Sequence, residues 1–308
     1  MDARVKPAHD HGEDMLWAVF TLIAAAAQTA RNAMQRELTA TLGTVGATHV
    51  RFLFGFPFAL IFLFGLIAVT GDRLPSAPFA FWPWVIAGAL TQIAATATML
   101  AAMNERSFVV AYAYIKTEPV QVALFGLVFL GDRLTPLSAI AILIGTAGVI
   151  VMSLKPGASK VSTWRSTAIG LISGSCFALS AISYRGAILS LDNPGFVLPA
   201  TFTLAVGLVI QAILLSAYLA LRDPGVLRAI AKAWKPSLFA GFMGAFASQF
   251  WFLGFAITSA ANVRTLALVE VLFAQGVTRF IFKQPTTARE GVGIVLVVIG
   301  VALLVWAY

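Results

Sequence analysis

The sequence carries very little charge for its length. Asp, Glu, Lys and Arg make up only 11% of its 308 residues, whereas soluble domains contain about 25%. Hydrophobic residues make up 59%, and the mean hydropathy is +0.89. A chain of this size has too few polar residues to cover the surface of a water-soluble globule. The composition therefore indicates an integral membrane protein, with the lipid bilayer as its main partner.

Cysteine and histidine are also nearly absent. The single cysteine, Cys176, excludes an internal disulfide and a multi-cysteine metal site. The only histidines are His9, His11 and His49, and the chain has no H-E-x-x-H, no G-x-S-x-G and no aspartate-rich metal motif. We therefore expect no metal, no cofactor and no enzyme, although a polytopic membrane enzyme stays as an alternative. Because there is no Walker A loop, ATP hydrolysis by this chain is excluded.

The net charge of +8 is spread through short segments between apolar runs. In a chain this apolar, Lys and Arg in loops report membrane topology and not nucleic-acid binding, so we exclude a nucleic-acid partner. The basic residues are densest in the loops 155–166 and 222–234. The positive-inside rule then places those loops in the cytoplasm and both termini outside, in a multi-pass membrane protein.

Apolar runs separated by turn signals and charges predict ten membrane-spanning helices after a flexible polar tail at 1–14. Nothing is left over for a soluble domain, so we expect an all-α membrane protein. The expected spans are 15–36, 46–70, 79–103, 107–130, 134–154, 167–189, 194–221, 235–258, 262–282 and 287–307.

The two halves of the chain resemble each other. A shift of 152 positions places Glu118 on Glu270 and Gly148 on Gly300. We therefore expect two five-helix repeats, 15–154 and 167–308, joined by a linker at 155–166. An odd number of spans per repeat inserts the second copy upside down. Inverted repeats around a central cavity are typical of secondary transporters, so the topology favours transport, with a passive channel as an alternative.

Four charges inside spans four and nine need an explanation. At a rise of about 1.5 Å per residue, Lys116 and Glu118 lie roughly 14 to 17 Å into the fourth span. Glu270 lies roughly 12 Å into the ninth span, and Arg264 is nearer its end. A charge at the bilayer centre costs about 3 kcal/mol on insertion scales. Two bases and two acids therefore indicate salt bridges between spans four and nine, a cavity that binds or gates substrate, or both.

Pro119 directly follows these charges. Because proline removes a backbone hydrogen bond and bends a helix, Pro119 is a candidate hinge. Helix bends are also common in membrane bundles, so an ordinary structural kink is the alternative.

A family resemblance enters at "PVQVALFGLVFLGDRLTPLSAIAILIGTAGVIVM", residues 119–152, and at "HVRFLFGFPFAL", residues 49–60. These segments resemble the drug/metabolite transporter superfamily, in its ten-span branch with an EamA-type domain in each half. The matching features are Pro119, the Asp132-Arg133-Leu134-Thr135 break and the glycines of the fifth span. The second half departs from the pattern, with "KQPTT" in place of the acidic–Arg break.

The resemblance implies a transporter of amino acids or other small metabolites, most similar to the bacterial aromatic amino acid exporters. Spans one, three and four of each half would surround the cavity, which favours Gln92, Tyr112, Lys116, Gln249 and Glu270 over Arg51 and His49. Trp251 and Tyr112 could stack on a substrate ring. For the uncharged residues, hydrogen bonding between helices is the alternative role. The full candidate cavity set is Gln92, Tyr112, Lys116, Glu118, Tyr184, Gln249, Trp251, Arg264, Glu270 and Gln275. Coupling to protons through Glu118 or Glu270 and uncoupled export both stay open.

Overall fold

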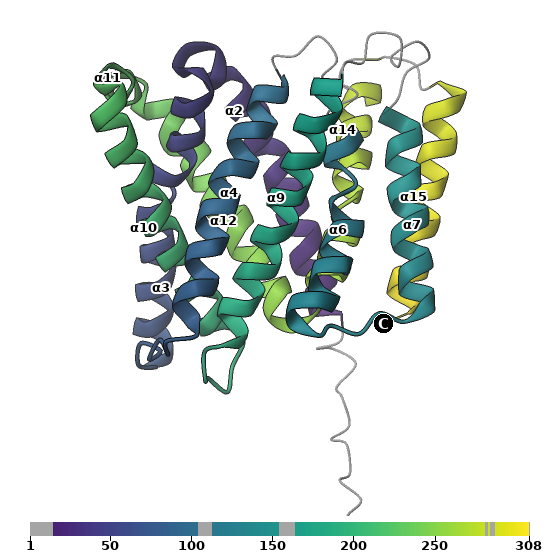
Figure 1. The fold of residues 1–308 in the computed structure, drawn as a ribbon, viewed down its shortest axis with the longest axis horizontal. Helices are drawn as coiled ribbons and strands as arrows, with labels where there is room; N and C mark the ends of the chain where they lie inside the picture. The colour runs from purple at the N-terminus through teal and green to yellow at the C-terminus, as the bar shows by residue number, and fades with distance from the viewer. Residues whose placement is uncertain (1–14, 104–112, 154–163, 281–282, 284–286, 308) are drawn as a thin grey trace, which may run out of the picture.

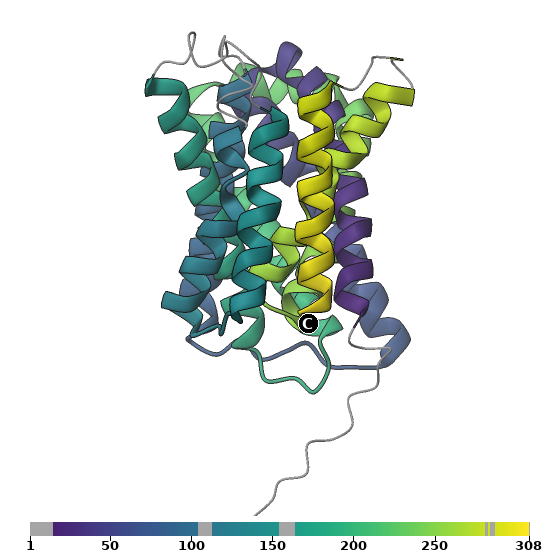
Figure 2. The same cartoon turned by 90° about the vertical axis from the view of Figure 1, so that its right-hand side faces the viewer.

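The computed structural model describes residues 15–103, 113–153, 164–280, 283 and 287–307. Within these ranges the chain is all-helical and has no strand. The helices stand side by side with their long axes roughly parallel (Figures 1 and 2), as expected where every backbone group in lipid must be paired internally.

In its described ranges the first half contributes six elements and the second half seven. The first six are α2 (Leu16–Leu53), α3 (Phe56–Thr70), α4 (Phe81–Met103), α6 (Glu118–Phe125), the π-helix η1 (Gly126–Leu130) and α7 (Pro136–Ser153). The others are α9 (Trp164–Leu189), α10 (Val197–Arg222), α11 (Pro224–Lys232), α12 (Trp234–Ile257), α13 (Ala260–Leu266), α14 (Val269–Phe280) and α15 (Ala288–Trp306).

Among the residues that the structure describes, eight helical stretches are long and apolar enough to cross a bilayer, which makes the chain a multi-pass membrane protein. They are Leu38–Thr70, Phe81–Ala102, Ala113–Leu130, Pro136–Ser153, Thr167–Leu189, Val197–Arg222, Trp234–Ile257 and Ala288–Trp306. The expected spans 15–36 and 262–282 are not among them. The first belongs to α2, whose helical path is interrupted at Gly43 (φ 68°), and the second is divided between α13 and α14.

The segment 222–234, expected as a connecting loop, instead contains the short helix α11. Pro224 occupies the first turn of this helix, where its missing N–H costs nothing. Ile230 is buried, and Val226 and Leu227 pack beside it against a cluster formed with α2 and α10. These three positions follow helical spacing, so α11 covers the end of the bundle with an apolar face.

Among the described residues, the three most extensive helix–helix contacts each join the first half of the chain to the second. Helix α2 packs along α12, α4 along α9, and α7 along α15. Figure 2 shows α7 (teal) and α15 (yellow) lying together. The two halves are therefore interleaved along most of their length, and the polar residues of spans four and nine lie inside this bundle.

Helices α7 and α15 approach so closely that their backbones touch. A Cβ added to Gly300 would lie 2.6 Å from the backbone nitrogen of Gly145. A Cβ added to Gly148 would lie 2.7 Å from the nitrogen of Val297 and 2.8 Å from the oxygen of Gly293. Small residues at a membrane helix interface permit this close packing. We call this contact the glycine seam, defined by Gly145, Gly148, Gly293 and Gly300.

Candidate functional site

Two helices are interrupted at corresponding positions of the two halves. The turn Lys116–Thr117 precedes α6, and the turn Ala267–Leu268 separates α13 from α14. Both turns are closed by three-residue hydrogen bonds, from the Thr117 nitrogen to the Tyr114 oxygen (3.1 Å) and from the Leu268 nitrogen to the Thr265 oxygen (3.1 Å). The two turns are 151 positions apart, one position short of the repeat offset of 152 found in the sequence. Interrupted helices inside a bundle free backbone and side-chain groups for binding.

Each interruption is flanked by a base and followed by an acid. Arg264 lies in the last turn of α13, and Glu270 lies in the first turn of α14. Glu118 occupies the first turn of α6, directly after Lys116 in its turn. The positive end of a helix dipole stabilises an acid in the first turn, and the negative end stabilises a base in the last turn. The ends of the short helices therefore stabilise charges that would be costly in a continuous helix.

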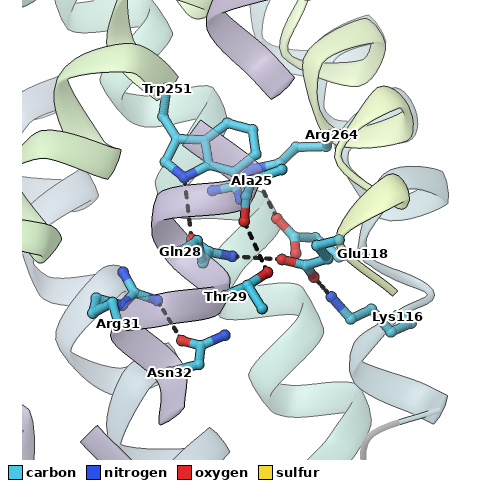
Figure 3. Close-up of polar contacts among 10 residues, drawn as sticks. Ala25, Gln28, Thr29, Arg31, Asn32, Lys116, Glu118, Trp251 and Arg264 are labelled. Carbon is cyan, nitrogen blue, oxygen red and sulfur yellow. Dashed lines mark hydrogen bonds and ion pairs between the residues drawn. The ribbon is translucent and has the colours of Figure 1, made fainter. Parts of the chain in front are cut away.

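The charges pair across the two halves of the chain. Lys116 Nζ forms an ion pair with Glu270 Oε1, and Arg264 Nε lies 3.1 Å from Glu118 Oε1 (Figure 3). All four side chains are at most 13% exposed. The sequence indicated bridges between spans four and nine, and the structure forms both. We call these four residues the charge cluster.

A hydrogen-bonded network extends the charge cluster to α2 and α12. Gln28 Nε2 donates to Glu270 Oε2 (3.1 Å), and Gln28 Oε1 accepts from Trp251 Nε1 (3.1 Å). The guanidinium carbon of Arg264 lies 4.9 Å from the centre of the Trp251 ring. Gln28 therefore hydrogen-bonds to the carboxylate of Glu270 and to the indole of Trp251. The ring of Trp251 in turn packs against the guanidinium of Arg264. Figure 3 shows Trp251, Gln28 and Arg264 converging on the same place.

Two small cavities lie beside the charge cluster, of about 20 Å³ and 30 Å³. Gln28, Lys116, Glu118, Arg264 and Glu270 line both cavities. A space of this size has room for about one or two water molecules. A larger molecule could enter only if the paired side chains moved apart.

Several predicted cavity residues lie elsewhere and bind protein groups. Gln92 accepts from Gln211 (2.9 Å), which joins α4 to α10, and Gln249 donates to Thr201 (2.8 Å), which joins α12 to α10. Tyr184 is 2% exposed, and its ring centre lies 4.6 Å from that of Phe252. None of these three lines the two cavities.

The remaining candidates are Tyr112, Gln275 and Pro119. Tyr112 lies outside the described residues. Gln275 is partly exposed on α14 and does not line the two cavities. Pro119 lines one of them, and it occupies the first turn of α6 instead of a helix interior. In that position proline is compatible with the helix that follows. The interruption is therefore formed by the turn before Pro119.

Sequence reasoning missed three cavity residues from the first span: Gln28, Arg31 and Asn32. Their spacing of three and four residues places them on one helix face, and that signal was present in the sequence. Arg31 is 2% exposed and donates to the amide oxygen of Asn32 (2.8 Å). Arg51, also disfavoured by the sequence reasoning, is 4% exposed and donates to Thr96 (3.1 Å).

A second polar cluster links the halves where the fourth span ends. Asp132 follows the π-helix η1, and its carboxylate lies 3.6 Å from Arg185 of α9. Arg185 also donates to the backbone oxygens of Phe255 and Thr258, at the C-terminal end of α12. A cation at this position satisfies carbonyl groups that the helix itself leaves unpaired.

Comparison with known proteins places this geometry in a family. The profile of the EamA-like transporter family matches residues 15–154 and 164–306, one copy in each half. No curated protein matches the chain. A solved protein, described only as "Crystal structure of protein", superimposes with a TM-score of 0.70 over 95% of both chains, at 15% sequence identity. That likeness shows the fold alone.

Proposed function

The chain belongs to the EamA-like transporter family of the drug/metabolite transporter superfamily, whose members transport small metabolites across membranes, and from this premise we propose its substrate and mechanism. It is a ten-span secondary transporter that exports amino acids, aromatic and other neutral ones, or related metabolites across a bacterial inner membrane. It works by alternating access between its two inverted halves.

The observation that carries the proposal is the crossed pairing of the charge cluster. Each half supplies one base and one acid, and each bridge joins opposite halves. A substrate that entered between the halves would meet all four groups at once. The amino group of an amino acid can replace a base, and its carboxylate can replace an acid. Substrate can therefore compensate for the bridges that separate when the site opens.

The small volume of the two cavities supports a mechanism in which helices move to admit substrate. Because the two cavities hold about a water molecule or two, an amino acid needs the interrupted helices to shift before it fits. The shift would break side-chain contacts and leave the backbone of α6 and α14 intact. Interrupted helices of this kind form the binding sites of many secondary transporters.

Aromatic selectivity would come from Trp251. Its ring already covers the guanidinium of Arg264, and an aromatic substrate could take the place of that cation. Gln28 would then hold the indole nitrogen while the ring face receives the substrate.

Proton coupling would use Glu118 or Glu270, the two acids of the charge cluster. Uncoupled export down a gradient is the alternative. A pH gradient applied to vesicles separates the two, since only the coupled mechanism accumulates substrate against its own gradient.

The test is counterflow of labelled phenylalanine, tryptophan and leucine in proteoliposomes. We expect saturable counterflow in the wild type and a loss of at least about tenfold in Lys116→Ala and in Glu270→Gln. Arg228→Gln is the matched control, because Arg228 is an exposed base on α11 far along the chain from the cluster. Transport that survives both cluster variants would make the bridges purely structural. Flux that never saturates would favour a channel, and a wild type that moves none of the three would overturn the amino acid proposal.

A further inference from the structure

Bases outnumber acids around the candidate site. Arg31 and Arg51 are 2% and 4% exposed, and among the described residues neither forms a salt bridge with an acid. The charge cluster is already neutral, with two bases and two acids. Counting Arg31, Arg51, Lys116 and Arg264 against Glu118 and Glu270, four positive charges face two negative ones, so the described site carries two charges in excess.

The two extra arginines lie next to each other at Gly244 of α12. A Cβ built on Gly244 would lie 3.3 Å from Cγ of Arg51 and 3.6 Å from Cδ of Arg31. Both side chains extend from α2, on either side of the interruption at Gly43. Like charges placed together inside a bundle repel each other and repel Arg264 nearby. The fold holds them together despite that repulsion.

Part of the hydrogen-bonding capacity of these arginines is unused. Among the described residues, Nε and Nη1 of Arg31 and Nε of Arg51 are buried without a hydrogen-bond partner. Arg31 lines the larger of the two cavities, together with Lys116 and Asn32. In Figure 3, Arg31 lies beside Gln28 and Asn32, on the side away from Lys116 and Glu118. Because Arg31 lines the larger cavity, we place its unpaired donors at the edge of the space that opens when the bridges separate.

Each edge of a planar guanidinium presents two parallel N–H groups, which match the two oxygens of a carboxylate or of a phosphate group. In Arg31 each edge has an unpartnered donor, Nε on one and Nη1 on the other, beside Nη2, which also donates to Asn32. A neutral zwitterion would leave the excess charge of the site unchanged. A ligand that carries net negative charge would reduce that excess and supply acceptors to the unpaired donors. An apolar or cationic ligand would do neither.

We infer that Arg31, with Arg51 behind it, forms an oxyanion-binding subsite, and that the transported molecule is a small organic acid with net negative charge. This inference rests on the proposed transport of small metabolites, and among those it selects acids with net negative charge in place of the neutral amino acids. Arg31 contacts the acid group directly. Arg51 is a positioning residue that adds positive field and fixes Arg31 through their shared contact with Gly244.

The test uses the purified full-length chain and two probes that differ only in charge: N-acetyl-phenylalanine and N-acetyl-phenylalanine amide. Binding is measured as the dose-dependent rise of the thermal unfolding midpoint. We expect the acid to bind at least about tenfold more tightly than the amide, as a charge-assisted bidentate contact requires. Phenyl phosphate and inorganic phosphate form a second arm, which shows whether the subsite prefers a carboxylate or a phosphate.

Substitutions test which side chain causes the preference for the acid over the amide. Arg31→Gln should bring the acid and the amide to within about twofold of each other, since the fork is lost. Arg31→Lys should keep the charge preference at weaker affinity, and it serves if the glutamine variant does not fold. Arg51→Gln should reduce the preference less than Arg31→Gln. Arg228→Gln, which removes an exposed charge, should leave the preference unchanged.

Equal binding of acid and amide by the wild type would overturn the inference, as would an undiminished preference in Arg31→Gln. A much lower unfolding midpoint in Arg31→Gln, with the preference intact, would make Arg31 a structural residue. The transport proposal can be refuted independently of the subsite. Acid-selective binding without counterflow of either the neutral amino acids or labelled N-acetyl-phenylalanine would retain the subsite and refute transport, whereas counterflow of neutral amino acids without acid selectivity would do the reverse.

Discussion

The two halves of this protein meet in two contrasting places. At the glycine seam, α7 and α15 touch backbone to backbone, with Gly145 against Gly300 and Gly148 against Gly293. At the charge cluster, α6, α13 and α14 meet through long charged side chains, with small cavities beside them. One contact is dry and has no spare volume. The other is polar and incompletely filled.

The difference shows which contact can open. Separating α7 from α15 would create a void between two backbones in which no side chain could take the vacated place. Separating the charge cluster exposes groups that water or a ligand can satisfy. The cluster is therefore the part of the interface suited to opening, while the glycine seam keeps the halves in register.

The largest expected effect comes from filling the glycine seam. Gly300→Ala places a methyl group 2.6 Å from a backbone nitrogen, so the helices must move apart at a cost of about 1–3 kcal/mol or more. Gly291→Ala lies in the same helix with nothing within 4 Å of its added Cβ. The control should be neutral or stabilise the helix by up to about 1 kcal/mol. Thermal unfolding midpoints and recovery of monodisperse protein measure both. Equal behaviour of the two variants would show that the seam is not tight.

The next effect comes from breaking one bridge of the charge cluster. Glu118→Gln leaves Arg264 buried without its acid, which should destabilise the fold by about 3–5 kcal/mol. The double variant Glu118→Gln/Arg264→Gln removes both charges and should recover most of that loss. Unfolding midpoints of the wild type, the two single variants and the double variant form a complete cycle. Additive losses in the double variant would mean that the two residues do not interact.

Transport assays on the same four proteins sharpen the contrast between the two contacts. The double variant should stay stable and still lose most counterflow, because the site keeps its shape without its charges. Full counterflow in a stable double variant would assign the bridge to stability alone.

The smallest expected effect comes from removing the proline of the first interruption or adding one at the second. Pro119→Ala should lower stability by about 1 kcal/mol or less, because Pro119 lies in a first helical turn where no N–H is needed. Its counterpart by the repeat offset is Val271, whose nitrogen donates to the Leu268 oxygen at 3.1 Å. Val271→Pro loses that bond and should cost about 1 kcal/mol more than Pro119→Ala. The unfolding midpoints give the comparison, and a severe defect in Pro119→Ala would show that proline itself forms the interruption.

The family resemblance rested on sequence motifs, and the family model confirms it. Salt bridges between spans four and nine were one of the roles that the sequence left open for the charge cluster, and the structure confirms them. Lipid penalises unpaired charges, so two acids and two bases at depth had few arrangements available. The all-helical class followed from the apolar runs in the same way. The structure supports eight spanning helices directly, and the ten-span count stays a prediction because α2 and the pair α13 and α14 are interrupted.

The orientation of single residues was harder to predict. Gln92 and Gln249 lie at suitable depth, yet each turns toward α10 and binds a protein partner there. In a membrane helix, the face toward lipid and the face toward the protein are both apolar. The sequence therefore predicts how deep a residue lies in the membrane, but not toward which neighbouring helix its side chain points. Arg31 is the opposite case. Its proposed role depends on its contact with Arg51 and Gly244, and the spacing of residues along α2 does not predict that contact.

The crossed pairing also has a consequence for synthesis of the chain in the cell. Lys116 and Glu118 leave the ribosome about 150 residues before Arg264 and Glu270, an interval of roughly 8–30 s at about 5–20 residues per second. During that time the fourth span enters the membrane with charges whose partners do not yet exist. Its apolar neighbours alone must retain it there. A nascent chain that stops before the ninth span lacks Arg264 and Glu270, so neither bridge of the charge cluster can form in it.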